Sequence, residues 1–280
     1  MNQLQEKYQM ENVYHPLQTK VLEVIDETPT IKTLVLKPPR EIHFRAGQFM
    51  QLTIAGIGEA PFTPSSSPHN LDTMEITILK AGHLTEAVHN LKAGDWVGLR
   101  GPFGKGYPLE KFMGKEILVV GGGVGQAPLR ALLYALFHDL SKIKRVSIKY
   151  GSRNPTELSF RRQYEQWKKL PGVDFECTVD RAAGDWKGKV GLVTELLENT
   201  GIDLSNAYAV SCGPEIMLKF VTLKLLSVGF QPEQIYLSMN RKMSCGMGLC
   251  GRCNIGPYYL CKDGPDMNYA KIQQYPDVFG

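Results

Sequence analysis

Four of the six cysteines lie close together near the C-terminus, with the spacing C-x4-C-x2-C-x7-C: Cys245, Cys250, Cys253 and Cys261. Glycines are interspersed among them, so the backbone can turn tightly and bring four thiolates to one metal centre. The C-x4-C-x2-C part has the spacing of plant-type [2Fe–2S] clusters. We therefore expect a C-terminal [2Fe–2S] module, which would transfer one electron at a time.

Two other uses of these cysteines need to be weighed. Disulfide bridges are rare in reducing compartments, and the polar N-terminus, Met1–Lys7, lacks the apolar stretch of a signal peptide. We therefore expect a cytoplasmic protein with reduced thiols. Structural zinc stays open, although zinc sites usually consist of two well-separated C-x2-4-C pairs, and the cysteine segment contains one C-x2-C pair.

The length and charge of the chain exclude several classes of protein. A chain of 280 residues is long enough for about two domains. Its net charge of +4 is spread along the sequence, so we expect no nucleic-acid partner. Its apolar runs are much shorter than the roughly 20 residues that a membrane span needs, so we expect no membrane span.

The first third of the sequence has the pattern of an antiparallel barrel. Short apolar runs alternate with glycine- and proline-containing turns, as expected for short strands that enclose a small barrel. These predicted strands cover residues 21–25, 31–36, 49–54, 74–78 and 96–99.

The pattern then changes to strands that alternate with helices. Residues 117–120 form a continuous apolar run, which is typical of a strand buried on both faces. Later strands are expected at 146–150, 174–179, 207–210 and 235–238, with helices between them, including residues 157–170 and 194–199. Such alternation predicts a parallel α/β sheet. The predicted fold is thus a β-barrel domain (residues 1–112), an α/β domain (113–238) and a cysteine module (239–280).

Two motifs fall at the carboxyl ends of predicted parallel strands, where ligands bind open α/β sheets. Gly121, Gly122, Gly123 and Gly125 follow the apolar run and precede a helix, so their backbone N–H groups could hold a pyrophosphate. The match to G-x-G-x-x-G is incomplete, because Gln126 stands at its last position, and an ordinary strand-to-helix turn is the alternative. The second motif, Cys212-Gly213, lies at the corresponding end of a later strand, where Cys212 could also be a buried apolar residue.

The barrel contains two further candidate segments. Phe62, Thr63 and Ser65 belong to a segment rich in proline and hydroxyl groups that could stack on and hydrogen-bond a planar heterocycle, although it could also be a plain loop. Gly82 and Thr85 precede a predicted helix over residues 86–91, with Thr85 as its N-cap. The N-terminus of that helix is a possible phosphate site.

The order of these motifs resembles the ferredoxin–NADP reductase superfamily. Within it, the chain is similar to the gamma subunits of cytoplasmic nickel–iron hydrogenases (sulfhydrogenases), to the electron-transfer subunit of dihydroorotate dehydrogenase and to a subunit of anaerobic sulfite reductase. The resemblance extends over nearly the whole chain. It rests on residues 46–49, 62–66, 82–85, 101–104, 121–129, 150–153 and 211–214, on the four cysteines, and on the tail 259–265.

The resemblance implies a role for each motif. Phe62, Thr63 and Ser65 would contact the flavin ring and ribityl chain, and Gly82 and Thr85 would hold the flavin's phosphates. The glycine-rich turn would hold the pyrophosphate of the nicotinamide nucleotide, and Cys212-Gly213 would approach the nicotinamide. The superfamily usually has R-x-[YF]-[ST] in the flavin segment, but Ala60 stands in place of that arginine. FAD is nevertheless expected rather than FMN.

The expected function is electron transfer between NAD(P)H, flavin and the [2Fe–2S] cluster, with no side-chain acid or base. Because the sequence offers no second redox motif, we expect partner catalytic and iron–sulfur subunits, with a nickel–iron hydrogenase as the first candidate. The alternatives are a sulfite reductase or dihydroorotate dehydrogenase complex, a stand-alone NAD(P)H:ferredoxin reductase, and a zinc-containing nucleotide sensor.

The choice of nucleotide rests on residues that follow two of the parallel strands. Arg153 and Arg181 could pair with a 2′-phosphate, whereas Asp180 could bind a free ribose 2′-hydroxyl and repel a phosphate. We expect NADH.

Overall fold

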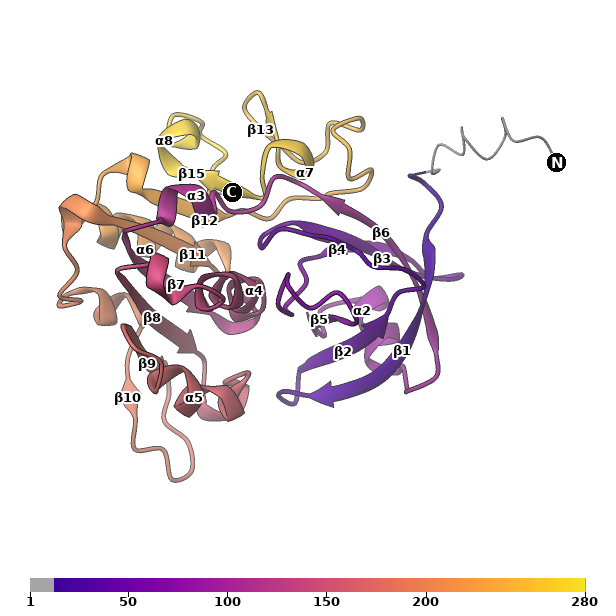
Figure 1. Ribbon diagram of the computed structural model, residues 1–280, viewed down its shortest axis with the longest axis horizontal. Coiled ribbons are helices and arrows are strands. Elements are labelled where there is room, and N and C mark those ends of the chain that lie inside the picture. Colours follow the sequence, from indigo (N-terminus) through magenta and orange to yellow (C-terminus); the bar gives the residue numbers. More distant parts are fainter. Residues whose placement is uncertain (1–12, 280) are drawn as a thin grey trace.

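A six-stranded antiparallel sheet forms the first part of the described chain, residues 13–279 of the computed structural model (Figure 1). The predicted polar N-terminus lies outside these residues. The strand order is β4-β3-β6-β1-β2-β5, and an isolated bridge between Pro64 and Ile76 brings the two edges together into a barrel. The strands are β1 (Leu17–Asp26), β2 (Ile31–Lys37), β3 (Phe49–Ile54), β4 (Gly58–Phe62), β5 (Met74–Leu79) and β6 (Trp96–Phe103).

A seven-stranded sheet follows, in the order β10-β9-β8-β7-β11-β12-β15, and all of its pairings are parallel except β12 with β15. Its strands are β7 (Glu116–Gly122), β8 (Arg145–Ser152), β9 (Val173–Val179), β10 (Lys189–Val190), β11 (Ala207–Cys212), β12 (Ile235–Ser238) and β15 (Asp266–Asn268). The α-helices around it are α3 (Leu109–Phe112), α4 (Gln126–Phe137), α5 (Tyr164–Lys168), α6 (Glu215–Ser227), α7 (Leu260–Asp263) and α8 (Tyr269–Ile272). This arrangement confirms the predicted barrel plus parallel α/β fold.

The central strand β7 shows why a continuous apolar run predicts such a sheet. Ile117 and Val119 belong to the core on one face of the sheet, whereas Leu118 and Val120 belong to the core on the other face. Because successive side chains point to opposite faces, a strand covered on both sides needs apolar residues at every position. A third core fills the barrel.

The helix predictions were less accurate than the strand predictions. Residues 157–170 contain short 3-10 turns before α5 instead of one long helix, and residues 193–197 form a 3-10 helix. Helix α2 (His83–His89) begins earlier than predicted, with Gly82 as its N-cap. The expectation that Thr85 is the N-cap is wrong: Thr85 is the third residue of the helix, and its hydroxyl accepts hydrogen bonds from the N–H groups of Ala81 and Gly82.

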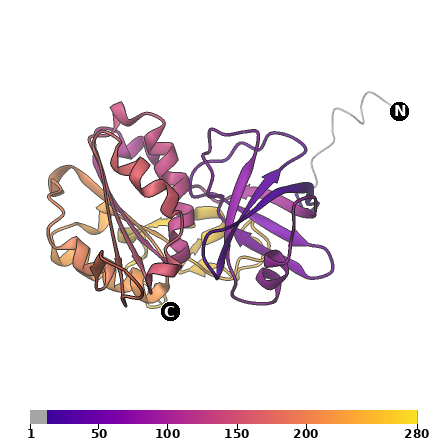
Figure 2. The same ribbon diagram turned by 90° about the horizontal axis from the view of Figure 1, so that it is seen from below.

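The C-terminal segment lies against both larger units (Figures 1 and 2). A short hairpin, β13 (Asn254–Ile255) with β14 (Tyr258–Tyr259), precedes α7, and the chain then returns to the α/β sheet as β15. Leu260 and Ile255 share a core with strands of the α/β domain. The boundaries at residues 112 and 238 stay predictions. None of the helices in residues 13–279 combines the length and apolarity that a transmembrane segment requires.

Candidate functional site

The four C-terminal cysteines lie as two contacting pairs, Cys245 with Cys250 and Cys253 with Cys261. None of them is in a disulfide. Cys253 and Cys261 are buried, Cys245 is half-buried and Cys250 is exposed, so one side of the group faces solvent. Since a [2Fe–2S] cluster takes two thiolates on each iron, two thiol pairs match what the cluster requires.

Backbone N–H groups point at these sulfur atoms, as they do around iron–sulfur clusters. Gly248 donates to Sγ of Cys261 at 3.0 Å, and Leu249 and Met247 donate to Sγ of Cys245 at 3.3 and 3.4 Å. Burial raises the pKa of the Cys245 thiol, but the N–H groups of Met247, Cys250 and Leu249 outweigh it and lower the pKa to about 6. The loop therefore favours the thiolate at Cys245, whereas burial and the neighbouring Cys253 raise the pKa of the Cys261 thiol to about 12.

The arrangement of the thiols also bears on the zinc alternative. Among residues 13–279, no group of three or more His, Cys, Asp or Glu side chains is arranged to hold a single metal ion. A structural zinc site requires four ligands around one ion. The four thiols still form one group, because Cys261 interacts electrostatically with Cys245 as well as with Cys253, and four thiolates are a donor set that zinc and a [2Fe–2S] cluster share.

The predicted glycine-rich turn lies at the carboxyl end of β7, directly before α4. Gly123 has a φ of +54° and begins a 3-10 turn, Gly123–Gly125, that leads into the helix. A Cβ atom on Gly125 would lie only 2.4 Å from the carbonyl oxygen of Cys212. The glycines thus allow the turn to pass close to the end of β11, so the structure brings the two predicted nucleotide motifs together.

Cys212 ends β11 and is buried beside this turn. Burial raises the pKa of its thiol to about 12, and the nearby Asp266 carboxylate adds to the rise. Cys212 is therefore a neutral thiol, unlike a reactive nucleophile or a metal ligand. Gly213 leaves space that the side chain of Met217 partly fills.

A pocket of about 360 Å³ opens at the same edge of the sheet, lined by Arg153, Asn154, Asp180 and Arg181. These residues follow β8 and β9, and the N–H of Arg181 donates to the carbonyl oxygen of Arg153 at 3.0 Å. Both guanidinium groups and the Asp180 carboxylate belong to exposed residues at the pocket. The structure thus brings together the residues predicted to distinguish a ribose hydroxyl from a phosphate.

The predicted flavin segment begins at the end of β4, with Phe62 and Thr63 half-buried. Ser65 is fully buried, and its hydroxyl lies 2.8 Å from Oγ1 of Thr77 inside the barrel. A flavin in this region would therefore meet Phe62, Thr63 and the backbone, whereas the Ser65 hydroxyl already has a partner. The second barrel motif, Gly82 and Thr85, lies at the N-terminus of α2, where Thr85 engages the nearby N–H groups. The flavin contacts of both motifs stay predictions.

Several residues near these motifs were not identified from the sequence. Arg130 of α4 is buried; it donates to the carbonyl oxygen of Ser65 at 3.1 Å and pairs with Glu75, so it connects the α/β domain to the flavin segment. Gln126 and Ser152 are buried at the carboxyl edge of the parallel sheet, and their side-chain polar atoms have no hydrogen-bond partner within residues 13–279. Buried polar groups are nearly always hydrogen-bonded, so we expect these atoms to find a partner in a ligand or an ordered water. The sequence did offer one signal for Gln126, because this residue stands where the G-x-G-x-x-G motif has its last glycine.

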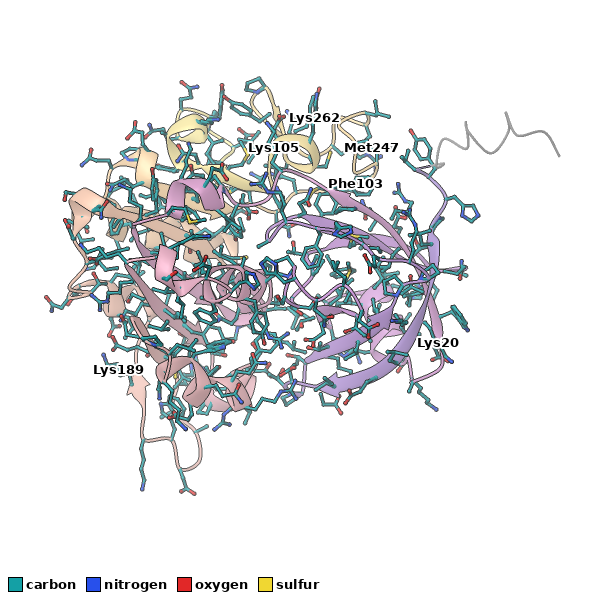
Figure 3. All side chains as sticks on the ribbon, viewed as in Figure 1. Lys20, Phe103, Lys105, Lys189, Met247 and Lys262 are labelled. Atoms are coloured by element: carbon teal, nitrogen blue, oxygen red, sulfur yellow. The ribbon has the colours of Figure 1, made fainter. Side chains whose placement is uncertain are left out.

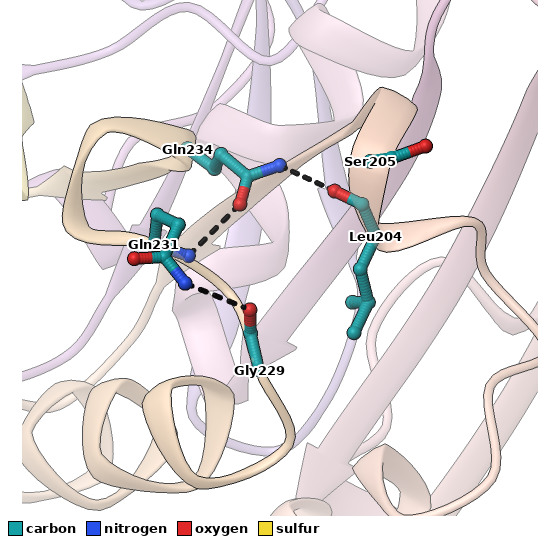
Figure 4. A pocket seen from close by; sticks show the side chains of 5 residues that line it. All are labelled: Leu204, Ser205, Gly229, Gln231 and Gln234. Carbon is teal, nitrogen blue, oxygen red and sulfur yellow. Dashed lines mark hydrogen bonds between the residues drawn. The ribbon is translucent and has the colours of Figure 1, made fainter.

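A second pocket of about 390 Å³ lies away from these motifs (Figure 4). Its polar groups bond to one another: Gln234 donates to the carbonyl oxygen of Leu204 at 2.7 Å, and its Oε1 accepts from the N–H of Gln231 at 2.8 Å. Because its polar atoms already have partners and no predicted site residue lines it, we do not assign the pocket a function.

Three family models match successive parts of the chain. Residues 18–107 match the oxidoreductase FAD-binding domain, and residues 119–222 match the oxidoreductase NAD-binding domain. Residues 240–273 match the iron–sulfur cluster binding domain of dihydroorotate dehydrogenase B. The last match supports the iron–sulfur interpretation of the cysteines over zinc.

Known proteins resemble the chain over most of its length. The sulfhydrogenase 1 subunit gamma of Pyrococcus furiosus is 34% identical over 279 residues, which cover 96% of each chain. A probable dihydroorotate dehydrogenase B electron transfer subunit of Methanocella arvoryzae is 35% identical over 257 residues, or 89% of each chain. Among solved structures, an NADH-dependent reduced ferredoxin–NADP oxidoreductase aligns with a TM-score of 0.74 and 22% identity over 93% of this chain and 94% of that one, which shows a shared fold.

Proposed function

Because this chain belongs to the ferredoxin–NADP reductase-like family of FAD- and NAD-binding electron-transfer subunits with an iron–sulfur domain, we propose that it is the NAD(P)H-linked subunit of a nickel–iron hydrogenase complex. A bound flavin would supply the exchange of a hydride with NAD(P)H, and a cluster on the four cysteines would supply one-electron transfer. One observation supports this proposal most strongly. The four cysteines of the C-terminal loop lie together on the same chain as the nucleotide motifs, and Cys250 faces solvent.

The residues of this chain would supply binding and orientation rather than acid–base chemistry. The turn Gly121–Gly125 would bind the pyrophosphate through backbone N–H groups at the start of α4. Cys212 and Gly213 would limit the space for the nicotinamide. Phe62, Thr63 and the backbone at Ser65 would hold the flavin ring, with Gly82 and Thr85 near its phosphates. Cys245, Cys250, Cys253 and Cys261 would bind the cluster.

The hydrogenase partner is favoured by the extent of the similarity. The sulfhydrogenase gamma subunit matches over 96% of its length, whereas the dihydroorotate dehydrogenase subunit matches over 89%. Both relatives are subunits by name. A partner subunit would therefore supply the catalytic centre, because the sequence of this chain offers no motif for one. We propose a cytoplasmic location for the complex.

Two measurements test this function. Anaerobically purified protein should contain FAD and two irons per chain, and it should reduce a dye with NAD(P)H. The native complex, isolated through a tag on this chain, should contain hydrogenase subunits and should couple NAD(P)H to hydrogen. Zinc in place of iron would contradict the electron-transfer role, and companion chains of a sulfite reductase or dihydroorotate dehydrogenase would contradict the choice of partner.

A further inference from the structure

Strands β3 and β6 of the barrel carry three side chains that face the cysteine loop, Gln51, Arg100 and Phe103, which we call the cluster-facing patch. Gln51 and Arg100 are paired across the two strands. Gln51 is fully buried, and its Nε2 donates to the carbonyl oxygen of Met243 at 2.8 Å. The carbonyl oxygen of Ser244 lies 3.5 Å from the same Nε2. One barrel side chain therefore holds the backbone immediately before Cys245.

Phe103 packs under the next part of the loop. A Cβ atom on Gly246, whose φ is +81°, would lie 2.8 Å from the Phe103 ring, so the loop passes directly over that ring. Figure 3 shows Phe103 and Met247 at the same end of the molecule, with Lys105 and Lys262 near them. Since only glycine fits this position, the loop follows the shape of the barrel surface.

Arg100 brings a charge to the same patch. Its side chain is 6% exposed, and its Nε donates to Oε2 of Glu59 at 2.8 Å, while its terminal nitrogen pairs with the other carboxylate oxygen. The guanidinium carbon of Arg100 lies 5.5 Å from the centroid of the Phe103 ring, over which Gly246 passes directly after Cys245. The guanidinium is thus within electrostatic reach of the cysteine loop, in a buried place where solvent screens charges little.

The patch also adjoins the predicted flavin segment. In the register of β3 with β4, Gln51 lies opposite Pro61, and Phe62 follows directly. Strand β3, which carries Gln51, therefore lies between β4, which leads into the segment expected to bind the flavin, and β6, which carries the rest of the cluster-facing patch.

We propose that Gln51 and Arg100 are positioning residues for the cluster: Gln51 fixes the Met243–Ser244 backbone on the barrel, and the Arg100–Glu59 pair sets the reduction potential. This inference rests on the proposed function, because it requires a cluster on the four cysteines. The cluster gains a negative charge on reduction, so a nearby cation favours the reduced state and a nearby anion opposes it.

Charge variants of the anaerobic holoprotein test the electrostatic role through an EPR-monitored redox titration. R100Q should lower the reduction potential and E59Q should raise it, each by about tenfold in the reduced-to-oxidised ratio, or about 59 mV. The double variant R100Q/E59Q should return close to wild type, because it removes both charges. R162Q removes a cation that pairs with Glu27 near α5, at the opposite end of the molecule from α7, and should leave the potential unchanged (Figure 1).

Shifts of the same sign in R100Q and E59Q, or no shift in either, would overturn this role. If R100Q does not fold, E59Q and the double variant still decide the question. For Gln51, Q51L should lose iron to a chelator about tenfold faster than wild type, and an unchanged rate would overturn the positioning role. A wild-type protein without iron would instead refute the proposed function itself, so the two failures can be told apart.

Discussion

Ser238 donates a hydrogen bond of 2.6 Å to Oδ1 of Asp266, which links the last parallel strand, β12, to the returning strand β15. The hydroxyl of Tyr107 lies 2.5 Å from the same Ser238 oxygen. Oδ2 of Asp266 is buried without a partner in the described part of the chain, against Gly47. Burial raises the pKa of Asp266 to about 7, although its hydrogen bonds to Ser238 and Tyr107 act in the opposite direction. Tyr107 and Cys212 are the titratable groups that interact with it.

This carboxyl should make stability depend on pH. Its folded-state pKa lies above the unfolded value of about 3.9, so ionisation opposes folding, and stability is lost as the pH rises toward 7. D266N should therefore be more stable than wild type at pH 8, by on the order of 4 kcal/mol, and similar to wild type near pH 4. Urea denaturation at several pH values measures the difference. D185N changes an exposed carboxyl and controls for net charge; parallel pH curves for wild type and D266N would contradict the prediction.

A second prediction follows from the division of the six cysteines into four that would bind the cluster and two, Cys177 and Cys212, that would not. C245S, C250S, C253S and C261S should each lose most of the iron and its visible absorbance, because each removes one of the cluster's four thiolates. C250S is the most direct test, since Cys250 is exposed and its replacement should not disturb the core. C177S and C212S change thiols in β9 and β11 and should keep their iron. Iron and sulfide analysis measures this, and iron loss in C212S would refute the assignment.

The strands and the cysteines were predictable from the sequence because their signals are local. Alternation of apolar residues, or a continuous apolar run such as Ile117–Val120, depends only on which faces of a strand are buried. Strand β4 was not predicted, because its sequence, Gly-Glu-Ala-Pro-Phe, has neither alternation nor β-branched residues. It forms a strand because it pairs with β3, and the local sequence pattern does not indicate that pairing.

The contacts between distant segments could not be predicted for the same reason. The residues around Arg130 in the sequence indicate only a helix, yet its partners Ser65 and Glu75 lie in the barrel. Asp266 is one acidic residue in a polar tail, and its burial arises only because β15 joins the edge of the α/β sheet. Such effects depend on tertiary packing, which short-range patterns do not encode.

The contact of Arg130 with Glu75 should stabilise the interface between the barrel and the α/β domain. The Arg130 side chain is 4% exposed and that of Glu75 is 24% exposed. Removing the arginine would therefore leave the Glu75 carboxylate unpaired and poorly solvated. R130M should lower the free energy of unfolding by about 3 kcal/mol, and R130M/E75Q should recover part of that loss. K168A, which breaks an exposed pair with Glu165, should cost less than about 1 kcal/mol. Equal losses in R130M and K168A would contradict this view.

The pocket lined by Arg153, Asp180 and Arg181 should determine the choice between NADH and NADPH. D180N removes the charge that would repel a 2′-phosphate, so it should shift the kcat/KM ratio toward NADPH by about tenfold, equal to about 1.4 kcal/mol. R181Q should shift the ratio toward NADH, because it removes a cation that could pair with the phosphate. Steady-state assays with a dye acceptor measure both ratios, and the flavin content should not change. Shifts in the same direction would show that the pocket does not read the 2′ position.

Substitution by alanine should have different effects at two glycines of the nucleotide turn, Gly122 and Gly125. A Cβ atom on Gly125 would lie 2.4 Å from the carbonyl oxygen of Cys212, a backbone atom that cannot move without displacing the end of β11. A Cβ atom on Gly122 would instead meet Sδ of Met217, and that flexible side chain can rotate away. Neither glycine has a positive φ, so backbone strain does not separate the two variants. G125A should therefore cost about 2–3 kcal/mol of stability and weaken nucleotide binding at least tenfold, whereas G122A should cost less than about 1 kcal/mol. Denaturation curves and nucleotide titration of the flavoprotein measure these effects; a G122A variant as impaired as G125A would show that close approach to β11 is not what the turn requires.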